Sequence, residues 1–144
     1  MAEATQNSTG LLHVRLVTPD RILLDATADA VELPATCGYL EALYGAAPLL
    51  AELGAGEVRL HGGASGGQVF FVASGFVEVL PERVTILAET ALPPADIKTE
   101  DAQAELAEGE KLWAEAGDDG HAYDRANTVI RRAEEKLHSA GDKH

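Results

Sequence analysis

Residues 69–88 read Val69-Phe-Phe-Val-Ala-Ser-Gly-Phe-Val-Glu-Val-Leu-Pro-Glu-Arg-Val-Thr-Ile-Leu-Ala88, and they decide the fold of the first part of the chain. The stretch is rich in β-branched and aromatic residues, which is typical of strands. Ser74-Gly75 and Pro81-Glu82 are turn residues that divide it, so the pattern predicts three short strands in quick succession. Strands joined by tight turns pair antiparallel. The stretch therefore predicts an antiparallel β-sandwich or barrel.

Apolar and polar residues also alternate in the sequence before this stretch. Residues 12–17 and 22–25 flank the turn sequence Thr18-Pro-Asp-Arg21, which predicts a hairpin. Further alternating stretches follow at 29–33 and 57–61. Short strands at this spacing, about eight or nine in all, are typical of a sandwich. Because no helical pattern separates them, a parallel sheet is not expected.

The sequence Leu92-Pro-Pro-Ala95 marks a change of structure. A double proline does not fit a central strand, and Asp96 after it is an acceptable helix N-cap. Apolar residues then recur at helical spacing, which predicts two helices at about 95–116 and 121–139, with Gly117-Asp-Asp-Gly120 between them. Small and apolar residues form one stripe on each predicted helix: Ala102, Leu106, Gly109 and Trp113 on the first, and Tyr123, Ala126, Ile130, Ala133 and Leu137 on the second.

The predicted fold class is thus mixed, with two domains. Residues 1–10 are polar and predict a disordered leader, residues 11–91 form the β-sandwich, and residues 92–144 form an α-helical hairpin. No segment has the length and apolar character of a membrane span, and the first residues do not resemble a signal or transit peptide. We therefore expect a protein of the cytosol that does not insert directly into the membrane.

Composition excludes several classes of function. The net charge of -13 argues against nucleic acid as a partner, because nucleic-acid-binding surfaces are rich in Lys and Arg. The single cysteine, Cys37, permits no disulfide within the chain. The five histidines show no metal-ligand spacing, and no nucleophile or acid/base set can be assembled. The sequence therefore predicts no catalytic residues, no metal and no cofactor.

The second predicted helix is basic within this acidic chain. It carries Arg125, Arg131, Arg132 and Lys136, while the first predicted helix is mainly acidic. These charges can complement each other within the hairpin through weak exposed pairs. They can equally serve docking on an acidic partner surface. Both interpretations stay open on the sequence alone.

The order of these parts resembles the epsilon subunit of the F-type ATP synthase, over about Leu11 to Leu137. Three motifs carry the resemblance: Val17-Thr-Pro-Asp20, residues 38–50, and residues 74–91. The last motif is the most specific. It is similar to the family pattern Ser-Gly-Gly-Phe-x-Glu-Val-x-Pro-x-x-Val-Thr-Ile-Leu-Ala, from which this chain departs mainly by lacking one glycine.

The resemblance implies a rotor subunit that is not an enzyme in its own right. The sandwich would dock on the gamma subunit and on the c-ring, and the hairpin would either fold up or extend along gamma and restrain ATP hydrolysis. Arg125, Arg131, Arg132 and Lys136 would then face the catalytic beta subunit, with alpha as a further neighbour. The implied location is peripheral, at the cytoplasmic face of a bacterial plasma membrane. A β-sandwich adaptor with a helical docking arm, unrelated to ATPases, is the alternative.

The middle motif is the rotor-facing loop that the resemblance implies. It is similar to the family pattern Gly-x-Leu-Gly-x-Leu-Pro-Gly-His-x-Pro-Leu, with Glu41, Tyr44 and Ala46 in place of glycine, proline and histidine. We expect the docking role to persist with altered local contacts. The expected contact residues for gamma and the c-ring are Gly38, Tyr39, Leu40, Leu43, Tyr44, Gly45, Ala46 and Pro48.

Some members of the family bind ATP through a motif similar to Ile/Leu-Asp-x-x-Arg-Ala at the start of the first helix. The matching residues here are Ile97-Lys-Thr-Glu-Asp-Ala102. Lys98 stands in place of the acid and Asp101 in place of the arginine. Because a carboxylate repels a triphosphate where a guanidinium would bind it, we predict weak or absent ATP binding.

Overall fold

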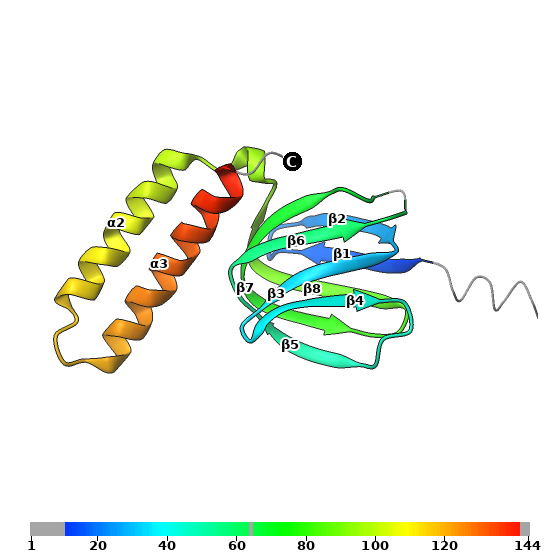
Figure 1. Cartoon of the computed structure of the whole chain (residues 1–144), viewed down its shortest axis with the longest axis horizontal. Helices are drawn as coiled ribbons and strands as arrows, with labels where there is room; N and C mark the ends of the chain where they lie inside the picture. Colours follow the sequence, from blue (N-terminus) through cyan, green and yellow to red (C-terminus); the bar gives the residue numbers. More distant parts are fainter. Residues whose placement is uncertain (1–10, 64, 142–144) are drawn as a thin grey trace, which may run out of the picture. The chain divides into compact units, whose positions relative to one another are not determined.

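The computed structural model describes residues 11–63 and 65–141. The predicted leader, residues 1–10, lies outside the described residues. The chain divides into two compact units at Leu92 and Pro93. Short strands make up the first unit and two long helices make up most of the second (Figure 1).

Among residues 11–63 and 65–92 the first unit contains eight strands, which confirms the predicted class of an antiparallel sandwich with one exception described below. Their bounds are β1 (Leu12–Val17), β2 (Ile22–Ala28), β3 (Ala30–Ala35), β4 (Gly38–Leu43), β5 (Leu49–Leu53), β6 (Gly56–His61), β7 (Val69–Val79) and β8 (Arg83–Leu92). The strand order is β2-β1-β8-β7-β5-β3-β4, and β6 pairs with both β3 and β7. The predicted hairpin of residues 12–25 is confirmed by the antiparallel pairing of β1 with β2.

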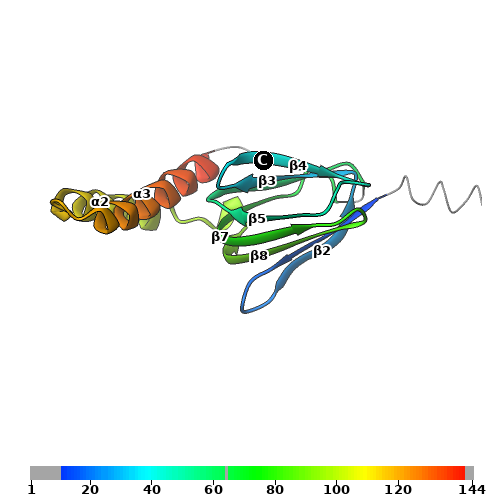
Figure 2. The same ribbon diagram turned by 90° about the horizontal axis from the view of Figure 1, so that it is seen from below.

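The strands form two layers that enclose the core. Figure 2 shows β3 and β4 lying over the layer that contains β7, β8 and β2. Alternate residues of each strand point inward, so apolar side chains from both layers meet between them. The largest fully buried side chains are Phe71, Leu12, Leu16, Leu33, Leu60, Ile86, Val14, Val31, Val58, Val72, Val77 and Val84.

Strand β7 corrects the predicted break at Ser74-Gly75. The strand runs without interruption from Val69 to Val79, and its pairing register with β8 stays the same on both sides of Gly75. Its other edge changes partner at this point, from β6 before the glycine to β5 after it. Ser74 and Gly75 have φ angles of 62° and 134°, which allow one strand to bend between the two layers. The turn residues thus mark a bend inside one strand.

The pairing of β1 with β8 is the exception to the antiparallel prediction. These two strands are parallel, with Val14 beside Val84 and Leu16 beside Ile86. Parallel neighbours need a long connection, and here the intervening strands of the domain provide it. The sequence pattern of each strand describes its own alternation and carries no information on the direction of so distant a partner.

The second unit contains a short 3-10 helix, η1 (Pro94–Asp96), and two long helices, α2 (Thr99–Glu115) and α3 (Gly120–Gly141). Helix α2 begins at Thr99, four residues after the predicted start. The 3-10 turn begins at the second proline, Pro94, and Ile97 and Lys98 are extended, so Lys98 and not Asp96 occupies the N-cap position. Asp119 caps α3, since its carboxylate accepts hydrogen bonds from the backbone N–H groups of His121 and Ala122. Within the described residues, neither helix is long and apolar enough to cross a bilayer.

The seam between α2 and α3 follows the predicted stripe. Ala102, Gly109, Ala126 and Ala133 are buried along it. A Cβ atom on Gly109 would lie 2.7 Å from Cγ1 of Ile130, so the glycine permits the close approach of the two helices. At the other end of the seam the rings of Trp113 and Tyr123 meet edge to face at 5.2 Å.

Candidate functional site

The predicted rotor-facing loop is only partly a loop. Residues 38–43 form strand β4, which pairs with β3 from Ala35 opposite Gly38 to Ala30 opposite Leu43, and only residues 44–48 are irregular. The alternation that makes this strand is short, with Leu40 and Ala42 facing the core. Strand β4 is difficult to predict from the sequence, because Gly38 and Gly45 at its two ends indicate breaks in an apolar run.

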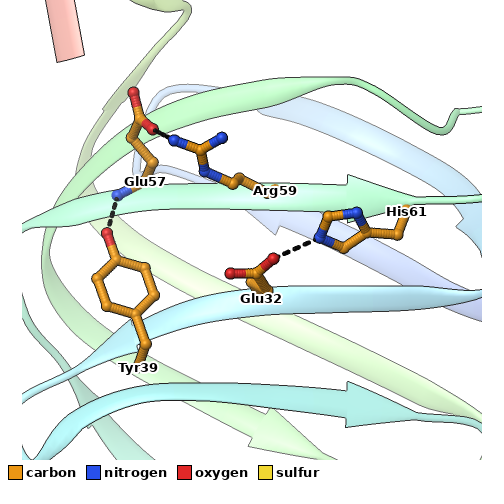
Figure 3. A network of polar contacts seen from close by, with 5 residues as sticks. All are labelled: Glu32, Tyr39, Glu57, Arg59 and His61. Carbon is orange, nitrogen blue, oxygen red and sulfur yellow. Dashed lines mark hydrogen bonds and ion pairs between the residues drawn. The ribbon is translucent and has the colours of Figure 1, made fainter. Parts of the chain in front are cut away.

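Tyr39 is exposed by 56%, yet its hydroxyl has a structural role. The hydroxyl oxygen accepts a hydrogen bond of 2.9 Å from the backbone N–H of Glu57 in β6 (Figure 3). The intervening strand β3 carries Pro34, whose carbonyl oxygen accepts from the N–H of Gly54. Tyr39 therefore supplies an acceptor across the end of the β3–β6 ladder, although more than half of the residue is exposed.

The residues after β4 divide into structural and exposed positions. Gly45 has a φ of 87° and donates a hydrogen bond of 2.6 Å to the carbonyl of Pro81 in the β7–β8 turn. Ala46 packs against the core and Tyr44 is half-buried. Leu43, exposed by 52%, and Pro48 are open to solvent. Of the predicted contact set, the positions available to a partner are therefore Gly38, Tyr39, Leu43, Gly45 and Pro48.

A second exposed surface was not predicted from the sequence. Besides Tyr39 and Leu43, four large apolar side chains of the described residues are more than half exposed: Ile22 at 51%, Leu50 at 70%, Phe76 at 53% and Leu87 at 53%. The pairing register places Phe76 beside Leu87, Leu87 beside Val17 and Val17 beside Ile22, so these residues form a row across four strands. Leu50 pairs with Glu78, which lies two residues from Phe76 on the same face. We call Ile22, Leu50, Phe76 and Leu87 the apolar row.

The sequence does contain a signal for the apolar row. In β7, Phe76 and Glu78 occupy the outward positions and the buried Val77 and Val79 occupy the inward ones. Phe76 is thus apolar where the alternation calls for a polar residue. An exposed group of large apolar side chains on a sheet is typical of a surface that binds another protein.

The predicted basic residues of α3 fall into two groups. Lys136 and Arg132 both bind the Glu105 carboxylate of α2, at 2.6 and 3.3 Å. Burial raises the pKa of Glu105, but the hydrogen bonds and charges of Lys136 and Arg132 outweigh it, so this pKa lies below its ordinary value. These two basic residues therefore stabilise the hairpin itself. Arg125 and Arg131 are exposed, and no ion pair to either is found among residues 11–63 and 65–141.

The start of α2 holds the residues that match the ATP motif. Ile97 is buried, while Lys98 and Asp101 are exposed. Glu100 and Asp101 place two acidic side chains in the first turn of the helix. They favour the helix electrostatically and oppose a phosphate at the same position. Weak or absent ATP binding stays a prediction.

One group of possible metal ligands comes together although spacing along the sequence predicts no metal site. Glu32, Glu41 and His61 each offer a ligand atom, and these atoms lie within 4.8 Å of one another. They belong to three neighbouring strands, β3, β4 and β6. Spacing rules miss the group because the sheet register, and not a local motif, joins it.

Comparison with known proteins gives consistent results for the whole chain. The family model for the β-sandwich domain of the ATP synthase delta/epsilon chain matches residues 11–94. The ATP synthase epsilon chain of Halalkalibacterium halodurans is 40% identical over 130 residues, which cover 90% of this chain and 97% of that protein. The epsilon chain of Granulibacter bethesdensis is 35% identical over 128 residues, covering 88% of this chain and 95% of that protein.

A solved structure supports the same fold at lower identity. A chain in the cryo-EM structure of the Euglena gracilis mitochondrial ATP synthase, OSCP/F1/c-ring, matches with a TM-score of 0.73 and 17% identity. The match covers 87% of this chain and 78% of that one. The sandwich, the helical hairpin, the family model and relatives of matching length agree, and the chain therefore belongs to the ATP synthase epsilon chain family.

Proposed function

We propose that this chain is the epsilon subunit in the central stalk of a bacterial F-type ATP synthase. The observation that carries the proposal is the match to an epsilon chain over 90% of this chain and 97% of the relative, which includes both units. The subunit couples proton transport through the c-ring to ATP synthesis, and catalysis belongs to other subunits. It works at the cytoplasmic face of the plasma membrane as a peripheral component. Because the family is shown, an adaptor unrelated to ATPases is no longer a competing explanation.

The sandwich contributes two surfaces to this function. The β4 edge and its turn, with Gly38, Tyr39, Leu43, Gly45 and Pro48 at the surface, are suited to the polar loops of the c-ring because backbone and a tyrosine dominate there. Leu40, Tyr44 and Ala46 support this edge from inside. The apolar row is suited to the gamma subunit, because its large apolar side chains need a stable protein partner to cover them.

The hairpin contributes the restraint on ATP hydrolysis. In the compact hairpin Arg125 and Arg131 face solvent and can approach an acidic surface of the beta subunit directly. Arg132 and Lys136 can join them only after they leave Glu105, whose ion pairs hold the hairpin closed. The seam is lined by small residues, Ala102, Gly109, Ala126 and Ala133, and a competing surface can replace it. Contact with alpha accompanies contact with beta.

Co-purification tests the proposed function. We expect the tagged chain to recover gamma and c-ring subunits from detergent-solubilised membranes of its own organism. Replacing Phe76 and Leu87 together by serine should weaken recovery of gamma by about tenfold or more, since central apolar anchors dominate most interfaces. The matched control is Leu112→Ser, which removes an exposed leucine from α2.

Each outcome of this experiment has a separate meaning. Recovery of neither gamma nor the c-ring by the unaltered chain would remove the proposed function. If gamma binding stayed unchanged in the double variant, the apolar row would be excluded as its docking surface. If Leu112→Ser weakened binding equally, the loss would reflect general surface changes and the assignment of the row would be wrong.

A further inference from the structure

The outer face of β6, β3 and β4 carries a compact group of titratable side chains. Glu32 in β3 lies directly opposite Glu41 in β4, and His61 in β6 approaches Glu32 from the other side. The His61 Nε2 and the Glu32 Oε1 are 2.5 Å apart (Figure 3). With Glu41, one imidazole nitrogen and two carboxylate oxygens lie within 4.8 Å of one another.

Two carboxylates meet at this place without a cationic side chain between them. Like charges directly opposite each other on a sheet destabilise it, and Glu32 and Glu41 are such a pair. Arg59 is the cross-strand partner of Glu32 in β6, but Figure 3 shows its guanidinium turned away from Glu32 toward Glu57, at 2.5 Å. Among the described residues, no Lys or Arg forms an ion pair with Glu32 or Glu41.

A second histidine on the same domain offers a direct contrast. His13 in β1 binds Asp25 in β2, as His61 binds Glu32. There, however, the Arg15 guanidinium also lies 3.7 Å from the carboxylate. Asp25 thus has the cationic side chain of Arg15 beside it, whereas Glu32 has a second carboxylate, that of Glu41, beside it. The first arrangement is a surface pair with a cationic neighbour, and the second is a group of three side chains whose ligand atoms could hold a metal.

We propose that Glu32, Glu41 and His61 bind one divalent transition-metal ion of the zinc type. Imidazole nitrogen and carboxylate oxygen are common zinc ligands, and three protein ligands leave the fourth position of a tetrahedral site to water. The metal takes the place of the hydrogen bond between His61 and Glu32. The inference concerns the sandwich alone and does not depend on the proposed function.

The fit requires only small side-chain movements. Ligands at about 2.0–2.2 Å from zinc lie about 3.4 Å from each other in a tetrahedral site. The longer separations, up to 4.8 Å, must therefore close by at most about 1.4 Å, while the 2.5 Å between His61 Nε2 and Glu32 Oε1 must open by about 0.9 Å. All three side chains lie at the surface, where rotation about their own bonds achieves this closure without movement of the strands.

Metal binding would act on β4 in particular. This strand ends the strand order and pairs only with β3 among the described strands. A metal that joins Glu41 to Glu32 and His61 cross-links β4 to β3 and β6, next to the segment that carries Tyr39 and Leu43. The site thus provides a means of fixing one docking edge of the sandwich.

Isothermal titration of the full chain with zinc chloride tests the proposal. We expect one saturable zinc site per chain in the wild type, and a rise in the melting temperature when zinc is added. Glu41→Gln should weaken zinc affinity by about tenfold or more, since even the loss of partners behind metal ligands costs about 10–100-fold. Gln keeps the size of the side chain and removes the like-charge pair, so this variant should fold at least as well as the wild type without metal.

His13→Gln is the matched control, because it alters a similar pair that has an arginine beside it. Its zinc affinity should equal that of the wild type, whereas His61→Gln should lose affinity as Glu41→Gln does. Absence of saturable binding in the wild type would overturn the proposal. Unchanged affinity in Glu41→Gln, or an equal loss in His13→Gln, would also overturn it.

Discussion

At the scale of single residues, Gly75 shows how one position connects the two layers of the sandwich. Its φ of 134° is strained for any residue with a side chain, and a Cβ there would overlap the carbonyl oxygen of Leu87 in β8. The bend lets β7 pair with β6 on one side of the glycine and with β5 on the other. Both the φ angle and the nearby Leu87 carbonyl exclude a side chain at position 75, so glycine is needed more strictly here than at an ordinary turn.

We predict that Gly75→Ala lowers the free energy of unfolding of the sandwich by about 3 kcal/mol or more, because backbone strain and a steric clash add. Gly67→Ala is the matched control, since Gly67 has a φ of 91° but an added Cβ there would meet no atom within 4 Å. It should cost only about 1 kcal/mol, from strain. Urea denaturation followed by far-ultraviolet circular dichroism measures both, and equal losses would contradict the role of the Leu87 carbonyl.

At the scale of the elements, Glu105 connects α2 to α3. It is the shared acceptor of Arg132 and Lys136, and its side chain is 28% exposed. Because its pKa is lowered from the ordinary value of 4.5, the folded hairpin favours the charged carboxylate. This stabilisation is complete above the ordinary pKa and is lost as the pH falls through the lowered value.

Glu105→Gln should therefore destabilise the hairpin at pH 7 by about 0.5–1 kcal/mol, the upper part of the range for partly exposed ion pairs. The difference from the wild type should disappear once the pH falls below the lowered pKa, because both side chains are then neutral. Trp113, the only tryptophan of the chain, packs on Tyr123 in this hairpin, so its fluorescence reports the unfolding. Glu108→Gln, on the exposed side of α2, is the control and should change stability little. A loss in Glu105→Gln that persists at low pH would contradict the electrostatic explanation.

At the scale of the whole molecule, the sequence predicts the classes of structure better than their connections. The change of period after the double proline predicts the helical hairpin, because that signal is local. Ser74-Gly75 predicts a break where the strand only bends, since glycine and serine mark bends and turns alike. The parallel pair of β1 with β8 could not be predicted, because the partner of Val14 lies 70 residues away and no local pattern encodes it.

The candidate surfaces, too, could be predicted where they depend on local sequence and not where they depend on the pairing of distant segments. The motif of residues 38–50 led to the β4 edge, but which of its side chains face solvent depends on the register with β3. The apolar row becomes visible as one surface only when the pairing of five strands is known. Likewise Arg132 and Lys136 meet Glu105 only through the packing of the two helices, so sequence alone left internal pairing and external docking as equal alternatives for the basic residues.

The structure assigns Arg132 and Lys136 to pairing within the hairpin and leaves Arg125 and Arg131 exposed. This difference leads to a prediction for the assembled enzyme. Arg125 and Arg131 are exposed and take no part in the Glu105 cluster, so Arg125→Glu with Arg131→Glu should leave the hairpin folded while it repels an acidic partner surface. We expect the reconstituted complex to hydrolyse ATP faster with this double variant, and a chain without residues 93–144 to set the upper limit. Lys111→Glu, a reversal on the exposed side of α2, should leave hydrolysis unchanged. If the shortened chain raised ATP hydrolysis but the double variant did not, Arg125 and Arg131 would not be the residues that restrain hydrolysis. The restraint would then depend on Arg132 and Lys136 after their release from Glu105, and Glu105→Gln should lower the rate of ATP hydrolysis further.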